Sequence, residues 1–131
     1  MSPVFSVFCN NNNMRITRLY SDAAGDSHFE DTEIDLLLHD YAPPAPPLRL
    51  SAFMPATQFG FMQAPTGWSS DWHPSSARNL FFVLTGEWEV RASDGETRRF
   101  AVGEVLLVED TTGKGHSSRV VDDSVAAMVQ L

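Results

Sequence analysis

Residues 80–100 decide the fold, and they read LFFVLTGEWEVRASDGETRRF. The run 80–84 is continuously apolar, which is typical of a strand buried on both faces. Residues 87–92 alternate between polar and apolar side chains, as a strand with one solvated face does. Asp94-Gly95 is the signal of a tight hairpin turn, and it joins this strand to another at 96–100. The stretch therefore predicts antiparallel β structure.

Short segments with the same chemistry recur on both sides, at intervals of about ten residues. The further strand candidates are 15–20, 48–53, 58–63, 105–108, 118–121 and 125–129. Residues 31–40 fit either a strand or a helical turn. The proline run 43–47 predicts a stiff connector that holds the preceding segment against the rest of the domain. This spacing predicts an all-β, antiparallel sandwich or barrel.

Length and composition indicate one globular domain. The 131 residues have a mass of 14.5 kDa, with 43% hydrophobic and 20% charged residues. These values exclude a fibrous repeat and disorder over the whole length. We expect a disordered tail over residues 1–13 and a single domain over 14–131. Cys9 has no second cysteine with which to form an internal disulfide, so we expect the cytoplasm as the compartment.

The charge balance bears on the class of partner. Seventeen acidic residues against nine basic ones give a net charge of −8. Such a chain repels phosphate backbones and anionic lipids, so we expect neither a nucleic-acid partner nor a membrane partner. No apolar run approaches the roughly 18 residues that a membrane span needs. A small-molecule ligand is the expected partner.

Two segments with glycines at fixed spacings, here called the glycine frames, enclose the central strands. The first contains Gly67, five residues, His73, Pro74 and Ser75, followed by Asn79, six residues and Gly86. The second begins at Gly103, before an apolar strand, and ends at His116. The two frames resemble the two motifs of the cupins. This resemblance covers about fifty residues at the level of motifs, and it implies an all-β, double-stranded β-helix barrel.

The resemblance also implies a metal site with an incomplete ligand set. Metal-binding cupins use two histidines and a glutamate from the first motif and one histidine from the second. Only His73 and His116 match, while Ser75 and Asn79 stand at the other two positions. Glu109 or Asp110 would complete a set of two histidines and one carboxylate. The metal-site hypothesis is therefore His73, His116 and Glu109, holding iron, manganese, nickel, zinc or copper.

The same histidines are candidates for acid–base chemistry. The glycines of 111–115 permit a sharp corner that brings Asp110 and His116 to one opening. An aspartate beside a histidine selects the imidazole tautomer, so His73, His116 and Asp110 are the catalytic candidates. His28 and His39 lie in polar surroundings and are interpreted as structural.

Aromatic and polar residues near the first histidine are candidates for substrate binding. The aromatic ones either pack in the core or form a wall for a flat ligand, and they are Trp68, Trp72, Phe59 and Phe61. Arg78 beside Asn79 is a candidate clamp for a carboxylate, although a position on the surface is the commoner outcome for an arginine.

Three functions follow from these residues. The first is a small-molecule-binding protein with a lyase or isomerase step carried out by the barrel histidines, with metal optional. The alternatives are a metal-dependent oxygenase and a ligand-binding barrel without turnover. We expect a homodimer, because exposed edge strands and the N-terminal segment need covering.

Overall fold

The computed structural model describes residues 8–10 and 12–131. Within this part of the chain the strands are β1 Phe8–Asn10, β2 Asn13–Ser21, β3 Ser27–Asp35, β4 Leu37–His39, β5 Leu48–Leu50, β6 Gln58–Ala64, β7 Ser69–His73, β8 Asn79–Val83, β9 Glu87–Ala92, β10 Thr97–Ala101, β11 Val105–Glu109, β12 His116–Asp122 and β13 Ser124–Gln130. The predicted disordered tail over 1–13 falls mostly outside the described residues. Among those that are described, no helix has the length and apolar character to cross a membrane.

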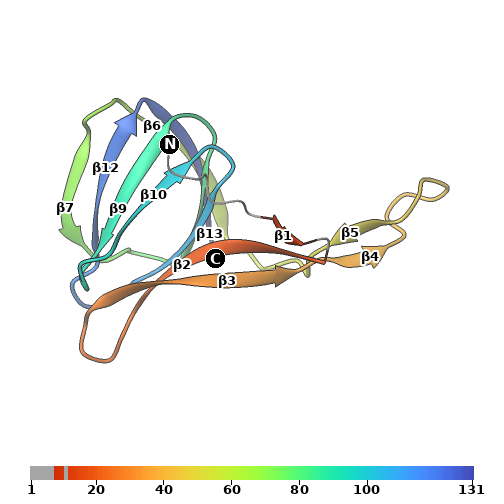
Figure 1. Ribbon diagram of the computed structural model, residues 1–131, viewed down its shortest axis with the longest axis horizontal. Helices are drawn as coiled ribbons and strands as arrows, with labels where there is room; N and C mark the ends of the chain where they lie inside the picture. Colours follow the sequence, from red (N-terminus) through yellow and green to blue (C-terminus); the bar gives the residue numbers. More distant parts are fainter. Residues whose placement is uncertain (1–7, 11) are drawn as a thin grey trace.

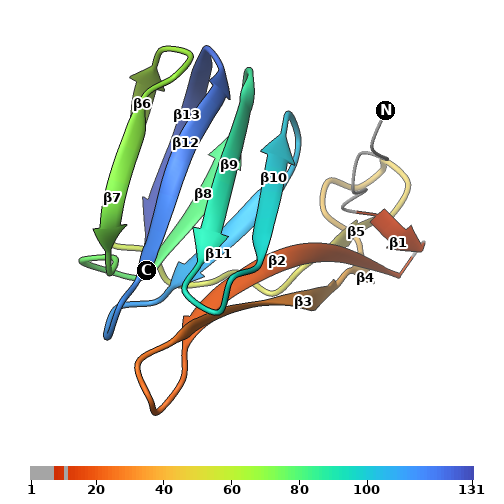
Figure 2. The ribbon, with the colours of Figure 1, turned by 60° about the vertical axis from the view of Figure 1, so that its left-hand side comes forward.

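The strands form three sheets. A seven-stranded sheet, here called the large sheet, has the order β1-β2-β11-β8-β13-β6, with β3 also paired to β2. A four-stranded sheet, the small sheet, has the order β10-β9-β12-β7. The third is a two-stranded hairpin of β4 and β5, here called the arm. The large and small sheets face each other, as Figure 2 shows.

The path of the chain through the two facing sheets defines the fold. From β6 to β9 successive strands alternate between the large and the small sheet, and the chain then reverses in the β9–β10 hairpin. From β10 to β13 it alternates back, with each returning strand antiparallel to its neighbours from the first pass. This winding is that of a double-stranded β-helix, so the predicted all-β, cupin-like fold is confirmed. One added pairing, between β2 and β11, is parallel.

The central strands show why this sequence forms these elements. In β9, Trp88 and Val90 are buried while Glu87 and Glu89 lie half-exposed, as the alternation predicts. β8 is buried along most of its length because it lies inside the large sheet, between β11 and β13. At the predicted hairpin turn, Gly95 has a φ of +99° and donates its N–H to the carbonyl of Ala92.

The main hydrophobic core lies between the two facing sheets. Its buried members include Leu19, Phe29, Phe81, Val83, Trp88, Val90, Phe100, Leu106, Val108 and Val120. A second, smaller cluster of Ile16, Leu80 and Leu107 comes from residues that alternate with these on the large sheet, and so lies on its outer face. The first cluster surrounds the site described below.

The proline run is not a connector held against the domain, contrary to the prediction. It lies in the loop between β4 and β5, and the arm projects away from the two facing sheets (Figure 1). Residues 31–40, for which the sequence left a strand or a helical turn open, end β3 and form β4. The arm is apolar and exposed, with Leu37 at 67% and Leu38 at 63% of their surface accessible.

Candidate functional site

The two histidines of the glycine frames lie next to each other. β7 ends at His73 and β12 begins at His116, and these residues are partners in the antiparallel register. Gly115 has a φ of +72°, and a Cβ at this position would overlap the carbonyl oxygen of His73. Glycine is therefore needed for the chain to pass this close to the His73 backbone. The two imidazole centroids are 4.8 Å apart.

Asp110 orients the second of these histidines. Its Oδ2 lies 2.5 Å from Nδ1 of His116, and the aspartate is fully buried. A carboxylate at this position selects the tautomer in which Nδ1 carries the proton, so Nε2 is left with its lone pair. The other carboxylate oxygen, Oδ1, is buried without a hydrogen-bond partner in the described part of the chain. The structure therefore brings together all three catalytic candidates.

His73 is oriented by its own strand. Its Nδ1 lies 2.8 Å from the carbonyl oxygen of Asp71. Because a carbonyl only accepts hydrogen bonds, Nδ1 must be the donor. In the neutral ring the lone pair is then on Nε2, as it is in His116. His73 is exposed and His116 is largely covered, so one ring has access to water and the other is shielded from it.

A cavity of about 330 Å³ opens beside the two rings, between the facing sheets. Its polar lining residues are His73, Ser75, Ser76, Asn79, His116 and Ser118. Its apolar lining residues are Met62, Trp68, Pro74, Phe81, Trp88, Val90, Leu106, Val108 and Met128. This volume lies in the range of small-molecule sites.

The lining is polar at one end and apolar along the rest. His73 ends β7, Asn79 begins β8 and His116 begins β12, so these residues meet at one end of the two sheets. Trp88 is paired with Val120, four residues further along β12 than His116. The apolar part of the cavity therefore extends along the strands, away from the histidines.

Asn79 is a buried member of the polar end. Its Nδ2 donates to the carbonyl of Ala77 at 2.9 Å and to Oγ of Ser75 at 3.2 Å. These bonds fix which end of the amide is nitrogen, because the Ala77 carbonyl can only accept. The amide oxygen, Oδ1, is buried and has no hydrogen-bond partner among the residues that the structure describes. An unpaired buried acceptor costs about 1–3 kcal/mol.

Glu109 is not brought to the histidines. It receives hydrogen bonds from Nε of Arg18 at 2.5 Å and from Nε of Arg78 at 2.6 Å. Burial acts to raise the pKa of Glu109, but the bonds from the two arginines outweigh it and hold the pKa below its usual value. On β11 it alternates with Val108, which lines the cavity, so it belongs to the opposite face of the strand.

Arg78 is therefore engaged outside the cavity, as a partner of Glu109. It is not among the described residues that line the cavity, and 54% of its side chain is exposed. The proposed carboxylate clamp of Arg78 and Asn79 is not assembled in this structure, since only Asn79 reaches the site.

Of the four aromatic candidates, one lines the cavity and three lie outside it. Trp68 lines the cavity and packs edge-on against Trp88, with the ring centroids 5.8 Å apart. Trp72 alternates with His73 on β7 and lies beside Lys114 in a separate hollow. The outer face of β6 carries the other two, Phe59 and Phe61, which are 74% and 70% exposed.

Most of the apolar wall was not predicted as a binding surface. The missed residues are Met62, Phe81, Trp88, Val90, Leu106, Val108 and Met128. The alternation of residues 87–92 predicts that Trp88 and Val90 are buried, but this pattern does not distinguish a filled core from the lining of a cavity. The signal for a cavity that the sequence carries is the presence of a tryptophan and two methionines, Trp88, Met62 and Met128, at inward-facing positions of three different strands.

The residues present do not fit a tight divalent metal site. Among the described residues, no three His, Cys, Asp or Glu side chains are grouped so that they could hold an ion. Asp110 is engaged with His116, and Glu109 with the arginines. The remaining donors are two imidazoles and the neutral oxygens of Ser75 and Asn79, which form a weak set for first-row metals.

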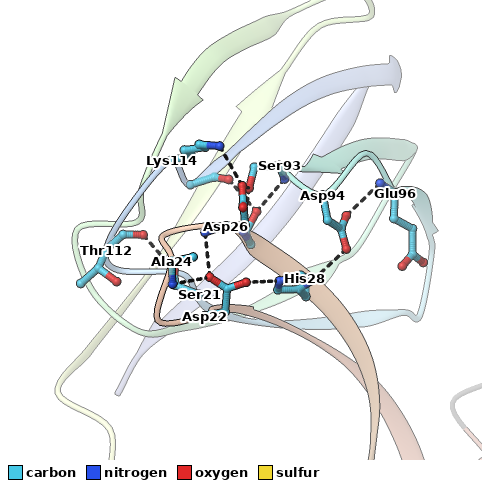
Figure 3. A network of polar contacts seen from close by, with 12 residues as sticks. Ser21, Asp22, Ala24, Asp26, His28, Ser93, Asp94, Glu96, Thr112 and Lys114 are labelled. Atoms are coloured by element: carbon cyan, nitrogen blue, oxygen red, sulfur yellow. Dashed lines mark hydrogen bonds and ion pairs between the residues drawn. The ribbon is translucent and has the colours of Figure 1, made fainter.

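Hydrogen bonds from the β2–β3 region hold the loop that carries Asp110 and His116. Ser21 donates to the carbonyl of Thr112 at 2.8 Å, as Figure 3 shows. Ser27, which is fully buried, donates to the carbonyl of Gly115 at 2.7 Å. The position of the loop 111–115 is thus fixed from both of its ends.

His28 lies at the centre of the network that braces this region (Figure 3). Its Nε2 is 2.6 Å from Asp22 and its Nδ1 is 2.9 Å from Asp94. The hydrogen bond to Asp22, and then the one to Asp94, raise the pKa of His28 above its usual value. Asp26 and Lys114 form a neighbouring ion pair at 2.9 Å. His28 is not among the described residues that line the cavity, and its interpretation as structural stays a prediction.

Comparisons with known proteins give structural likenesses only. No family model and no curated protein matches this sequence. A conserved protein of unknown function from Streptococcus pyogenes is 20% identical over 61% of this chain and 68% of its own, with a TM-score of 0.47. The cupin domain of Cnp3 from Schizosaccharomyces pombe is 15% identical over 92% and 82%, with a TM-score of 0.43. The protein NMB1881 from Neisseria meningitidis is 19% identical over 61% and 90%, with a TM-score of 0.41.

Proposed function

We propose that this protein binds a small organic molecule in the cavity between its sheets and carries out an acid–base step on it, of the lyase or isomerase class. One observation carries the proposal. Two imidazoles from different strands line one cavity, and each has its Nδ1 occupied by an acceptor outside the ligand space. Their Nε2 atoms are therefore the nitrogens left for proton transfer.

The surroundings of the two rings suggest different roles. His116 is the general base in this proposal: its Nε2 takes a proton from the bound molecule, and the buried carboxylate of Asp110 stabilises the imidazolium that forms. His73 is the acid in its imidazolium form, in which both ring nitrogens carry a proton, so it delivers the proton of Nε2 to a second position or to a leaving group and is left as the neutral ring. Its exposure lets it exchange that proton with water. Asp110 acts through His116 and is a positioning residue.

Hydrogen–deuterium exchange into a simple carbon acid tests the base and does not require the natural substrate. The probe is 2-tetralone, a neutral two-ring ketone with acidic C–H bonds, incubated with the protein in D2O and followed by NMR. We expect protein-dependent exchange that falls by about 10²-fold or more in His116→Ala. Asp110→Asn should reduce the exchange rate more than it changes the affinity. His39→Ala, on the arm, is the matched control and should behave as wild type.

The same experiment separates the alternatives. Exchange that survives a chelator supports metal-independent chemistry. Exchange that is lost with the chelator and restored by one metal would instead support metal-dependent chemistry, with a ligand set other than His73, His116 and Glu109, and oxygen consumption by the metal-loaded protein with a substrate would then support the oxygenase alternative. Binding of 2-tetralone without exchange in wild type would support a ligand-binding barrel and would contradict the catalytic proposal.

We also propose that the protein is a homodimer. The arm presents Leu37, Leu38, Tyr41 and Leu48 to solvent, with 42–67% of each exposed. Exposed apolar side chains gathered on a projecting hairpin are typical of surfaces that are covered by a partner.

A further inference from the structure

We propose that the ligand of the cavity is an uncharged molecule with an apolar ring system and a single hydroxyl or N–H group, which donates a hydrogen bond to Oδ1 of Asn79. This inference rests on the proposed function, because it concerns the same cavity. It assigns to Asn79 the role of a specificity-determining residue.

The first argument is the unpaired oxygen of Asn79. The residue is 7% exposed, and both of its amide hydrogens are used, by Ala77 and Ser75. Its Oδ1 is buried, and no group in residues 8–10 and 12–131 forms a hydrogen bond with it. Asn79 alternates with Phe81 on β8, and both residues line the cavity. A ligand group that reaches this oxygen must be a donor, because a carbonyl, ether or carboxylate oxygen offers it no hydrogen.

The second argument is the charge of the lining. None of the described residues that line the cavity is Lys, Arg, Asp or Glu. Arg78 is the nearest arginine in sequence to Asn79, and it is held by Glu109 outside the cavity. The fixed negative charge of Asp110 lies behind His116, and the whole chain carries a net charge of −8. An anionic ligand would lose its hydration with no Lys or Arg among the described lining residues to pair with it.

The third argument is the shape and chemistry of the remaining wall. Phe81, Trp68 and Trp88 contribute rings that pack edge-on, with the centroids of Phe81 and Trp88 5.3 Å apart. Met62 and Met128 complete the apolar part of the lining, and methionine side chains adapt their shape to aromatic partners. With a volume of about 330 Å³, the cavity suits one or two fused rings.

A set of three matched probes tests the inference by calorimetry on the full chain. They are 2-naphthol, 2-methoxynaphthalene, in which the donor is removed, and 2-naphthoate, which is anionic. We expect wild type to bind 2-naphthol more tightly than the ether by roughly fivefold or more. It should bind the naphthoate more weakly than either neutral probe.

Variants at Asn79 then test whether its Oδ1 is the acceptor of this hydrogen bond. Asn79→Leu has a similar volume and no acceptor, so the ratio of the affinities for naphthol and ether should fall towards one. Asn79→Asp retains an acceptor, so it should keep the preference for naphthol and reject the naphthoate further. Asn79→Asp also provides a test of the inference if the leucine variant does not fold. Phe61→Ser, on the outer face of β6, is the control against adventitious binding to exposed rings and should leave all three affinities unchanged.

The inference is overturned if 2-naphthoate binds as tightly as 2-naphthol, if no probe binds wild type, or if Asn79→Leu retains the wild-type preference. These failures are distinct from failure of the proposed function. A preference for naphthol that depends on Asn79, together with a lack of 2-tetralone exchange, would remove the catalytic step and leave the ligand class standing. Exchange that depends on His116, together with a preference for the naphthoate, would remove only the ligand class.

Discussion

At the scale of single residues, Gly115 controls the distance between the two site histidines. It is next to His116 in the chain, and its Cα faces the backbone of His73 at a distance that leaves no space for a side chain. Its φ of +72° is also unfavourable for any residue with a Cβ. The pairing of the imidazoles therefore depends on a residue that carries no functional group.

We predict that Gly115→Ala destabilises the fold and separates the two rings. The strain of a positive φ costs about 1–3 kcal/mol, and the contact with the His73 carbonyl adds to it. Urea denaturation measures the loss. The matched control is Gly95→Ala, where φ is +99° but, apart from Gly95 itself and its two chain neighbours, no heavy atom of the described residues lies within 4 Å of the added Cβ. Equal losses in the two variants would show that the close approach to His73 is unimportant.

At the scale of elements, the β2–β3 turn supports the site loop, although it contributes no residue to the cavity. Its hydrogen bonds reach Thr112 and Gly115, and its own conformation depends on His28 between Asp22 and Asp94 (Figure 3). The loop 111–115, which carries the chain from Asp110 to His116, is therefore held by a hydrogen-bond network whose charge changes with pH.

We predict that the stabilising effect of His28 declines at alkaline pH. The pKa of His28 is raised, first by its hydrogen bond to Asp22 and then by the bond to Asp94. Its contribution to stability is therefore fully present below its usual pKa of 6.5 and is lost as pH rises through the raised value. The same pairing lowers the pKa of Asp22 below 3.8, so that carboxylate contributes above 3.8 and loses its contribution in acid.

Thermal unfolding of wild type and His28→Gln from pH 4 to pH 9 measures this effect. The difference between them should be largest near pH 5–6 and should shrink towards pH 9. It should be modest and reduced by salt, because about 30% of the His28 side chain is exposed. His39→Gln is the control and should follow the wild-type curve. A difference that grows with pH would contradict the assignment.

At the scale of the whole molecule, the arm stands apart, because packing within the domain does not account for its exposed apolar side chains. Its strands pair only with each other among the described residues, and it projects beyond the facing sheets (Figure 1). Isolated two-stranded hairpins are marginally stable in water, so covering its apolar side chains would stabilise it.

We predict that the chain elutes as a dimer in size-exclusion chromatography with light scattering, and that Leu37→Glu combined with Leu38→Glu shifts it to the monomer. Both leucines are more than 60% exposed, so the double variant should not unfold the domain. Arg49→Glu, which changes charge on the same hairpin, is the control for a purely electrostatic effect. A wild-type monomer at micromolar concentration would contradict the prediction.

The strand pattern and the two glycine frames could be read from the sequence because their causes are local. Alternation along β9 reports which side chains are buried, and a glycine at a hairpin reports a backbone that other residues avoid. The prediction that the proline run holds the preceding segment against the domain was wrong for a related reason. Its stiffness is local, but what it connects depends on the pairing of β4 with β5.

The allocation of side chains to the site was only partly predictable. Of the residues that the sequence singled out, His73, His116, Asp110, Asn79 and Trp68 were brought together. Arg78 and Glu109 were instead brought to each other on the opposite face of β11. A carboxylate one residue from Asp110 looks equivalent in the sequence, but successive residues of a strand point to opposite faces.

The sequence by itself determined an all-β chain with short strands, one certain hairpin, and two histidines at the ends of two glycine frames. These follow from side-chain periodicity and from backbone freedom, which are properties of neighbouring residues. Only the tertiary structure decided that the cavity is apolar along its wall, that Asp110 orients His116, and that Oδ1 of Asn79 has no hydrogen-bond partner among the described residues. Each of these depends on contacts between strands that are distant in the chain, and such contacts are set by how the two sheets pack.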